Sequence, residues 1–127
     1  MNTGPGPANV MTNADDFRRL ALGFKGTEAQ PHMDRTAFRV VRTYATLAPD
    51  GLTVNFKFTP DEQRARCLFA PDAFAPVAGG WGKQGWTTAK LAKLTEDELT
   101  DAILLAWQMA RLKRLPKIPV GKSPQKT

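Results

Sequence analysis

Residues 52–62, LTVNFKFTPDE, join the pattern of a strand to the pattern of a helix start. Apolar and polar side chains alternate over residues 52–58, which predicts a strand with one buried face and one polar face. The predicted buried set is Leu52, Val54, Phe56 and Phe58, and the predicted polar set is Thr53, Asn55 and Lys57. Thr59 suits a helix cap, Pro60 fits the first helical turn, and Glu62 predicts a capping box.

The residues before this strand are also typical of a sheet. Residues 38–47 are rich in Val, Thr and Tyr and are predicted to be extended. APDG at 48–51 is predicted to be the turn of an antiparallel hairpin. Further upstream, we expect a helix capped by Asn13 and ended by Gly23, followed by a loop over residues 26–36.

Downstream, a loop is expected to lead to a short strand at residues 86–90. TEDE at 95–98 predicts a second capping box and the longest helix, which is expected to end near Leu115 because Pro116 follows. Its predicted apolar face is Leu99, Ala102, Ile103, Ala106 and Ala110, widened by Leu105 and Trp107. The order helix, hairpin, helix, strand, helix predicts an α+β fold with an antiparallel sheet.

The length of 127 residues suits one domain. Residues 1–12 contain GPGP and are expected to be disordered, residues 13–116 to form the domain, and residues 117–127 to be a flexible, basic, Pro-rich tail. Neither a membrane-spanning apolar run nor a signal-peptide pattern is present. We therefore expect a cytoplasmic protein without membrane contact, and a monomer.

Reactive side chains are few. The only serine, Ser123, lies in the tail, so a Ser-His-Asp triad is out of reach. His32 and Cys67 are the only residues of their types and cannot supply a zinc ligand set. Cys67 is interpreted as a structural thiol. The sequence predicts a protein that is not an enzyme and has no metal or other cofactor.

Positive charge gathers at the C-terminal end. The net charge is +6, and six of the 18 basic residues but none of the 12 acidic residues follow residue 110. Such an end attracts polyanions, although it also serves solubility. Lys113 and Arg114, at the end of the long helix, are therefore candidates for contact with nucleic acid.

The stretch at residues 79–88, GGWGKQGWTT, does not look merely structural, because it combines four glycines, two tryptophans, a lysine and a glutamine. Lys83 can meet a phosphate, Gln84 can contact a base edge, and Trp86 can stack on a base. The alternative is that Trp81 and Trp86 are core anchors.

Two further candidates lie upstream. Arg39 and Arg42, in or near the first predicted strand, could contact phosphates, although arginines are also common on solvated sheet faces. His32 is interpreted as either a structural loop residue or a ligand contact, and Trp81 in the same way.

Several short motifs together resemble the MmcQ/YjbR family. They are HM at 32–33, FRV at 38–40, YATL at 44–47, TPDEQ at 59–63, WGKQGWT at 81–87 and the helix end at Lys113-Arg114. The resemblance covers roughly residues 14–114. It implies a CyaY/frataxin-like fold, with helices on one face of an antiparallel sheet, and a DNA-binding function without known catalytic residues.

One segment departs from the family pattern. Many relatives have a glycine turn between the two strands that correspond to FRV and ATL, whereas residues 41–43 here contain no glycine. A continuous or bulged strand is therefore expected at this point.

These observations lead to a main hypothesis and an alternative. The main hypothesis is a non-enzymatic DNA-binding domain that contacts mainly phosphates and has weak sequence preference. The alternative is a protein-interaction or small-ligand-binding module that uses the Gly-Trp stretch.

Overall fold

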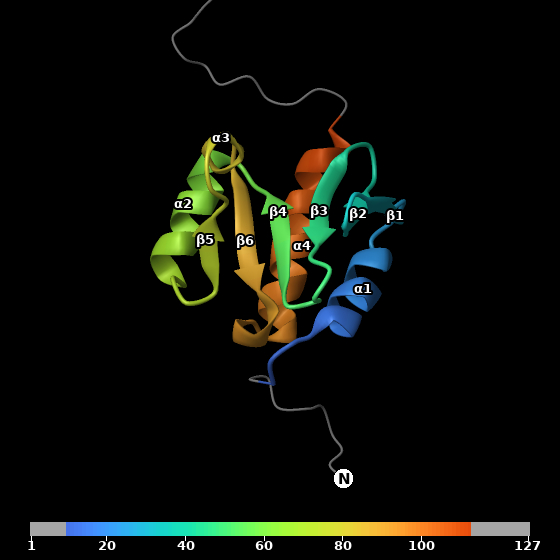
Figure 1. Cartoon of the computed structure of the whole chain (residues 1–127), viewed down its shortest axis with the longest axis horizontal. Coiled ribbons are helices and arrows are strands. Elements are labelled where there is room, and N and C mark those ends of the chain that lie inside the picture. Colours follow the sequence, from blue (N-terminus) through green and yellow to red (C-terminus); the bar gives the residue numbers. More distant parts are fainter. Residues whose placement is uncertain (1–9, 113–127) are drawn as a thin grey trace, which may run out of the picture.

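In the computed structural model, which describes residues 10–112, a six-stranded antiparallel sheet packs against helices (Figure 1). The elements are α1 (Ala14–Leu22), β1 (Glu28–His32), β2 (Arg35–Arg39), β3 (Thr43–Leu47), β4 (Thr53–Lys57), α2 (Pro60–Phe69), β5 (Phe74–Pro76), α3 (Gly80–Lys83), β6 (Trp86–Lys90), a 3-10 turn (Leu91–Lys93) and α4 (Glu96–Arg111). The strand order is β1-β2-β3-β4-β6-β5. The predicted α+β class is confirmed.

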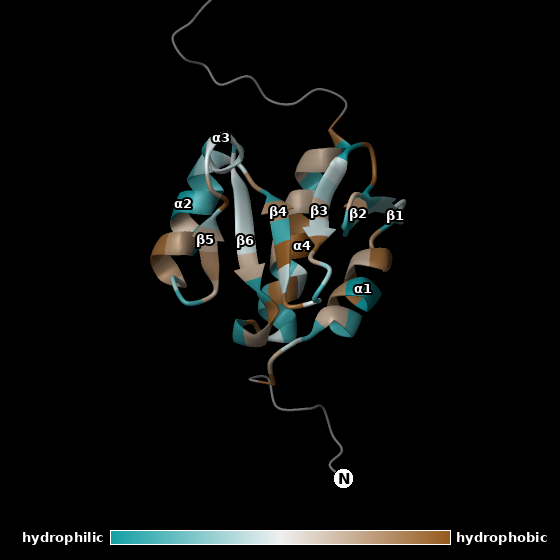
Figure 2. Ribbon diagram, in the orientation of Figure 1, coloured by the Kyte–Doolittle hydropathy of each residue, from teal (hydrophilic) through white to brown (hydrophobic). Residues whose placement is uncertain are grey.

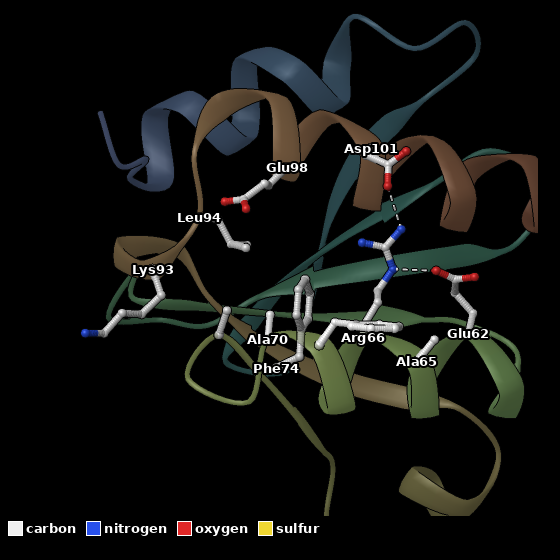
Figure 3. Close-up of a pocket in the computed structure, with 11 residues that line it drawn as sticks. Glu62, Ala65, Arg66, Ala70, Phe74, Lys93, Leu94, Glu98 and Asp101 are labelled. Carbon is white, nitrogen blue, oxygen red and sulfur yellow. Dashed lines mark hydrogen bonds and ion pairs between the residues drawn. The ribbon is translucent and has the colours of Figure 1, made fainter. Parts of the chain in front are cut away.

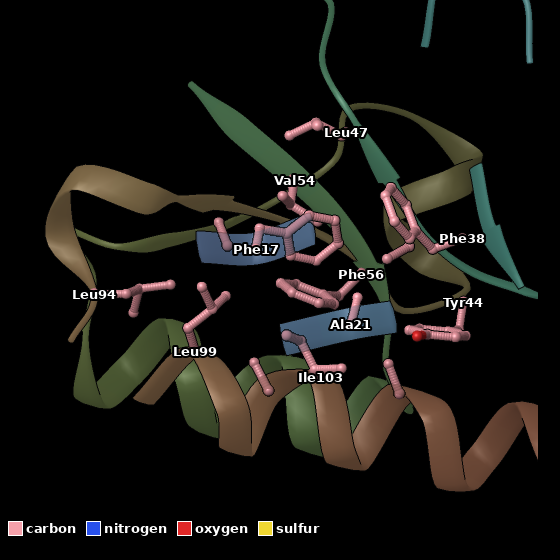
Figure 4. Close-up of a cluster of buried hydrophobic side chains, with 14 of the residues drawn as sticks. Phe17, Ala21, Phe38, Tyr44, Leu47, Val54, Phe56, Leu94, Leu99 and Ile103 are labelled. Atoms are coloured by element: carbon pink, nitrogen blue, oxygen red, sulfur yellow. The ribbon is translucent and has the colours of Figure 1, made fainter. Parts of the chain in front are cut away.

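One face of the sheet is covered by helices. In Figure 1, α4 passes behind β3 and β4, with α1 and α2 on its two sides. Its ribbon is largely brown in Figure 2, because the residues that face the sheet are apolar. The Phe17 ring meets the Phe38 and Phe56 rings edge to face, at centroid distances of 4.8 and 6.0 Å (Figure 4). The core therefore lies between the sheet and the two helices α1 and α4.

The alternation predicted for residues 52–58 is confirmed except at Leu52. Val54, Phe56 and Phe58 are buried, whereas Leu52 is 65% exposed, so its predicted burial is wrong. Leu52 precedes the strand, and its N–H donates to the Asp50 carboxylate at 2.9 Å. The turn, and not the strand pleat, sets the direction of this side chain.

The segment before β3 differs most from the prediction. The expected loop over residues 26–36 is wrong, because β1 and the start of β2 form a hairpin there. Residues 38–47 are not one strand either, since the chain turns between β2 and β3 and the register shifts after Phe38. All side chains of β1 are exposed and one is Pro31, so this edge strand lacks the apolar alternation that reveals a strand.

The helix starts follow the sequence closely. Asn13 and Thr95 both cap helices through complete capping boxes, and Thr59 accepts the N–H of Glu62. The predicted capping box of α2 is nevertheless wrong, because the Glu62 carboxylate pairs with Arg66 at 2.8 Å. The predicted loop between α2 and β6 contains two short elements, β5 and α3.

Two predicted boundaries differ from the structure, namely the start of the ordered chain and the end of the long helix. The Thr12 N–H donates to the carbonyl of Leu94 and its hydroxyl to that of Leu91, at 3.0 and 2.8 Å. The expectation of disorder through residue 12 is therefore wrong for Thr12 and for Met11, which forms a bridge with Thr95. Helix α4 ends at Arg111, before the predicted end at Leu115. The predicted tail, residues 117–127, lies outside the described residues.

Candidate functional site

The face of the sheet that points away from α4 is mainly polar, and no helix of residues 10–112 crosses it in Figure 1. We call it the open sheet face. Its side chains lie on the face opposite Val54, Phe56 and Ala89 and include Arg35, Thr46, Thr53, Asn55, Lys57, Trp86, Thr88 and Lys90, of which Thr46 is itself buried. Pairing between β4 and β6 places Trp86 opposite Lys57 and Thr88 opposite Asn55, where the Thr88 hydroxyl donates to Asn55 Oδ1 at 2.8 Å.

Residues 79–85, called the Gly-Trp segment, lie at the end of this face where β6 begins. The Trp81 and Trp86 rings meet edge to face, with centroids 6.5 Å apart, and Trp81 is 63% exposed. Trp86 is half-buried, whereas Lys83 and Gln84 are exposed. The structure therefore brings together four of the predicted candidate residues, and Trp81 is not a core anchor.

Lys57 joins the segment to the sheet. Its Nζ donates to the carbonyl oxygen of Gln84 at 2.8 Å, and partial burial lowers the pKa of this amine. An ammonium has three N–H groups, so two remain for another acceptor. The alternation of the strand predicted that Lys57 faces outward, although it was not among the predicted site residues.

Close packing fixes the path of the Gly-Trp segment. A Cβ on Gly82 would lie 1.9 Å from the carbonyl oxygen of Val77, and a Cβ on Gly85 would lie 1.9 Å from that of Phe58. Gly85 also has a φ of 108°. From the other side, the Gln63 amide donates to the carbonyls of Gly82 and Trp86, both at 2.9 Å. The glycines here permit backbone contact that no side chain would allow.

Arg39 and Arg42 lie away from this segment. Strands β3 and β4 separate β2 from β6, so Arg39 is about 14 Å away, three strand spacings. Its guanidinium donates to the carbonyl of Val41 at 3.0 Å. Arg42 donates to the carbonyls of Ala110 and Leu112, which places its charge at the negative end of α4.

The remaining candidates are placed only in part. His32 is exposed at the end of the edge strand β1. Lys113 and Arg114 lie outside the described residues. On the last turn of α4, the Arg111 guanidinium lies 4.5 Å from the Trp107 ring centroid, and the Trp107 N–H donates to the carbonyl of Lys25 at 3.0 Å. This third tryptophan therefore has a packing role.

Arg35 and Lys90 on the open sheet face were not among the predicted site residues. Arg35 lies across β3, where its Nε donates to the Thr46 hydroxyl at 2.8 Å and Nη2 donates to the Thr46 carbonyl at 2.9 Å. Arg35 was hidden because its strand was predicted to be a loop. Lys90 alternates with the buried Ala89 in a strand that was predicted correctly, so its direction could have been found.

Basic side chains on the helices and on the sheet differ in whether they pair with carboxylates. Arg18, Arg19, Arg64 and Arg66 all pair with carboxylates, on α1, α2 and α4. In residues 10–112, by contrast, no carboxylate pairs with Arg35, Arg39, Lys57, Lys83 or Lys90. The open sheet face and the adjoining segment thus present positive charge that the described part of the chain does not neutralise.

A groove of about 310 Å³ lies between α2 and α4 (Figure 3). Arg66, with a side chain only 12% exposed, pairs there with Glu62 and Asp101, both at 2.8 Å. Its guanidinium also lies over the rings of Phe58 and Phe74, at 5.0 and 5.6 Å from their centroids. Arg66 and its two carboxylate partners are thus engaged with one another, which indicates a link between α2 and α4.

Other kinds of site have little support in the described residues. No group of three His, Cys, Asp or Glu side chains in residues 10–112 could hold a metal ion. Cys67 is half-buried, and burial raises the pKa of its thiol, as expected for a structural cysteine. Within the same residues, no helix has both the length and the apolar character needed to cross a bilayer.

Comparison with known proteins gives a family and a related fold. The family model described as YjbR matches residues 22–109. The crystal structure of Deinococcus radiodurans protein DR2400, a DUF419 domain, superposes with a TM-score of 0.69 at 18% sequence identity, covering 93% of this chain and 100% of that one. No curated protein matches the chain. At this identity, the structural likeness concerns the fold alone.

Proposed function

The chain belongs to the YjbR family, and from that premise we propose that it is a non-enzymatic DNA-binding domain. The observation that carries the proposal is the set of unpaired cations on the open sheet face and the Gly-Trp segment. Four of the five arginines on the helices of residues 10–112 have carboxylate partners, and the fifth, Arg111, lies over the Trp107 ring, so the contrast is not a general lack of acidic residues. A surface of this kind suits the phosphates of a nucleic acid.

The proposed contacts are mainly with phosphates. Lys83 and Lys57 at one side of the sheet, and Arg39 at the other, would hold the backbone of DNA. Lys113 and Arg114, which follow α4 in the sequence, would add to them. Gln84 is the one exposed amide in the Gly-Trp segment and would contact a base edge. With so few groups of that kind, sequence preference is expected to be weak.

A salt titration of DNA affinity tests this function. Each phosphate neutralised adds about 0.9 to the slope of log affinity against log salt concentration for a duplex. Lys83→Glu should weaken binding and flatten that slope. Lys93→Glu is the matched control, because Lys93 is also exposed and unpaired in the described residues but lies in the 3-10 turn beside the groove between α2 and α4.

Two outcomes would contradict the function. One is an absence of salt-dependent DNA binding by the full chain. The other is an equal loss of affinity in Lys83→Glu and Lys93→Glu, which would reflect net charge rather than a surface. A form without residues 117–127 separates the contribution of the tail lysines from that of the domain.

A protein-interaction module is the second candidate, because Trp81 is a largely exposed tryptophan next to another one. Exposed tryptophans often anchor protein interfaces. Such a module would bind its partner with little dependence on salt, and the charge reversal at Lys83 would not change DNA binding in a coherent way.

A further inference from the structure

The helices of this domain are poorly suited to the major groove of a duplex. α4 is the longest helix, but its apolar face is buried against the sheet and its first turn carries three acidic residues. α1 and α2 also have acidic first turns, and α3 has only four residues. Recognition helices place base-reading side chains in the major groove, and no described helix offers a basic, exposed face for that purpose.

The Gly-Trp segment provides a different kind of contact. Trp81 exposes 63% of its surface, and the Trp86 ring supports it edge to face at 6.5 Å. An exposed indole can stack on a nucleic-acid base, but only on a base that is not already stacked and paired within a duplex. Trp107 differs, since its ring is covered by Arg111 and its N–H is bonded to Lys25.

Cations lie on the same short stretch as the exposed ring. Lys83 follows Trp81 by two residues and is exposed, with no carboxylate partner in the described part of the chain. Lys57 reaches the carbonyl of Gln84. A stacking ring beside cations is the arrangement with which proteins bind single strands, where bases contact aromatic rings and phosphates meet basic groups.

The Gly-Trp segment is also fixed in the structure without a ligand. Gly82 and Gly85 pack directly against backbone carbonyls, and Gln63 donates to two carbonyls of the segment and its neighbour. Fixing these residues in advance lowers the entropy that binding would otherwise cost.

We infer that the Gly-Trp segment and the adjoining end of the open sheet face bind single-stranded DNA, with an unpaired base stacked on Trp81 and the adjoining phosphates held by Lys83 and Lys57. The inference rests on the proposed DNA-binding function and specifies the form of DNA. Because stacking tolerates any base, it agrees with weak sequence preference.

The test compares three ligands on the full chain: an oligothymidylate, the duplex of that strand with its complement, and a strand of equal length in which the bases are removed. The oligothymidylate should bind more tightly than the duplex, and the abasic strand should lose about 10- to 100-fold in affinity. Trp81→Ala should cause a similar loss for oligothymidylate, with an unchanged salt slope, and Trp81→Phe should restore much of the affinity.

Phe69→Ala is the matched control, because Phe69 is 84% exposed but lies at the end of α2, away from the open sheet face. The affinity of the Phe69→Ala protein for oligothymidylate should equal that of the parent chain. Thermal unfolding should show that Phe69→Ala and Trp81→Ala are both folded. Tighter binding to duplex, or full affinity in Trp81→Ala, would overturn this inference while leaving DNA binding in place. Absence of binding to all three ligands would overturn the proposed function itself.

Discussion

The two faces of β4 meet opposite surroundings. On the inner face, Val54 and Phe56 are fully buried among the rings and aliphatic side chains of α1 and α4. On the outer face, Asn55 accepts one hydrogen bond from Thr88, and Lys57 donates to one carbonyl. The side chains of the inner face are thus fully packed within the chain. The outer face, by contrast, keeps a charged ammonium and polar groups that can accept or donate further hydrogen bonds. Stability is expected to depend on the first face and DNA affinity on the second.

Neighbouring alanine substitutions in β4 should separate the two faces most strongly. Phe56→Ala removes a ring that packs on Phe17 and Phe58, and should lower the free energy of unfolding by about 3–5 kcal/mol. Asn55→Ala removes one hydrogen bond on the outer face and should cost about 0.5–1.5 kcal/mol. Urea denaturation measures both, and comparable losses would show that the two faces are not different.

Substitution of Gly85 should show how tightly the outer segment is fixed to the inner core. Gly85→Ala combines a positive φ with a clash against the Phe58 carbonyl, so we expect a loss of at least about 1–3 kcal/mol. Gly80→Ala is the control, because no atom lies within 4 Å of its added Cβ and the residue is helical. A tolerated Gly85→Ala, measured by thermal unfolding, would contradict the account of a rigid segment.

The inner face should also respond to alkaline pH. Burial raises the pKa of Tyr44 to about 12, above the ordinary value of 10.0. The unfolded chain therefore releases this proton first, so stability falls as pH rises from about 10 to about 12, by up to about 2 kcal/mol. Denaturation across this range should be flatter in Tyr44→Phe, and an equal pH dependence in both proteins would contradict the assignment.

The smallest stability change is expected at Lys57. Burial lowers the pKa of this lysine, because the ammonium loses hydration, so an apolar replacement should be tolerated. Lys57→Met removes one hydrogen bond but also the cost of burying the ammonium, so the free energy of unfolding should change by less than about 1 kcal/mol. Its DNA affinity should nevertheless fall and its salt slope should flatten. Unchanged affinity in a folded Lys57→Met protein would remove Lys57 from the proposed site.

Local sequence signals predicted the secondary structure correctly where it is determined by residues close together in the sequence. The caps at Asn13 and Thr95 and the strand at residues 86–90 agree with the structure, because capping and alternation are set within a few positions. The edge strand β1 was missed because its exposed side chains carry no periodic signal. Long-range pairing is likewise invisible locally, as the contact of Arg42 with the end of α4 illustrates.

The candidate site shows the same division. The Gly-Trp stretch could be singled out by composition, since glycines, tryptophans, a lysine and a glutamine are unusually concentrated there. The contact between this stretch and Lys57 depends on the pairing of β4 with β6. In the sequence, these two strands are separated by a helix, a third strand and a short helix. Exposure of Trp81 and partial burial of Trp86 also depend on that pairing, which the sequence does not reveal.

The three indole N–H groups of the chain provide the most direct test of where DNA lies. A two-dimensional nitrogen–proton spectrum resolves one indole signal for each tryptophan, and single Trp→Phe variants assign them. On titration with oligothymidylate, we predict a large shift for Trp81, a smaller one for Trp86 and none for Trp107, whose N–H donates to the carbonyl of Lys25. Saturable binding that shifts Trp107 and leaves Trp81 in place would contradict the claim that the open sheet face is the binding surface.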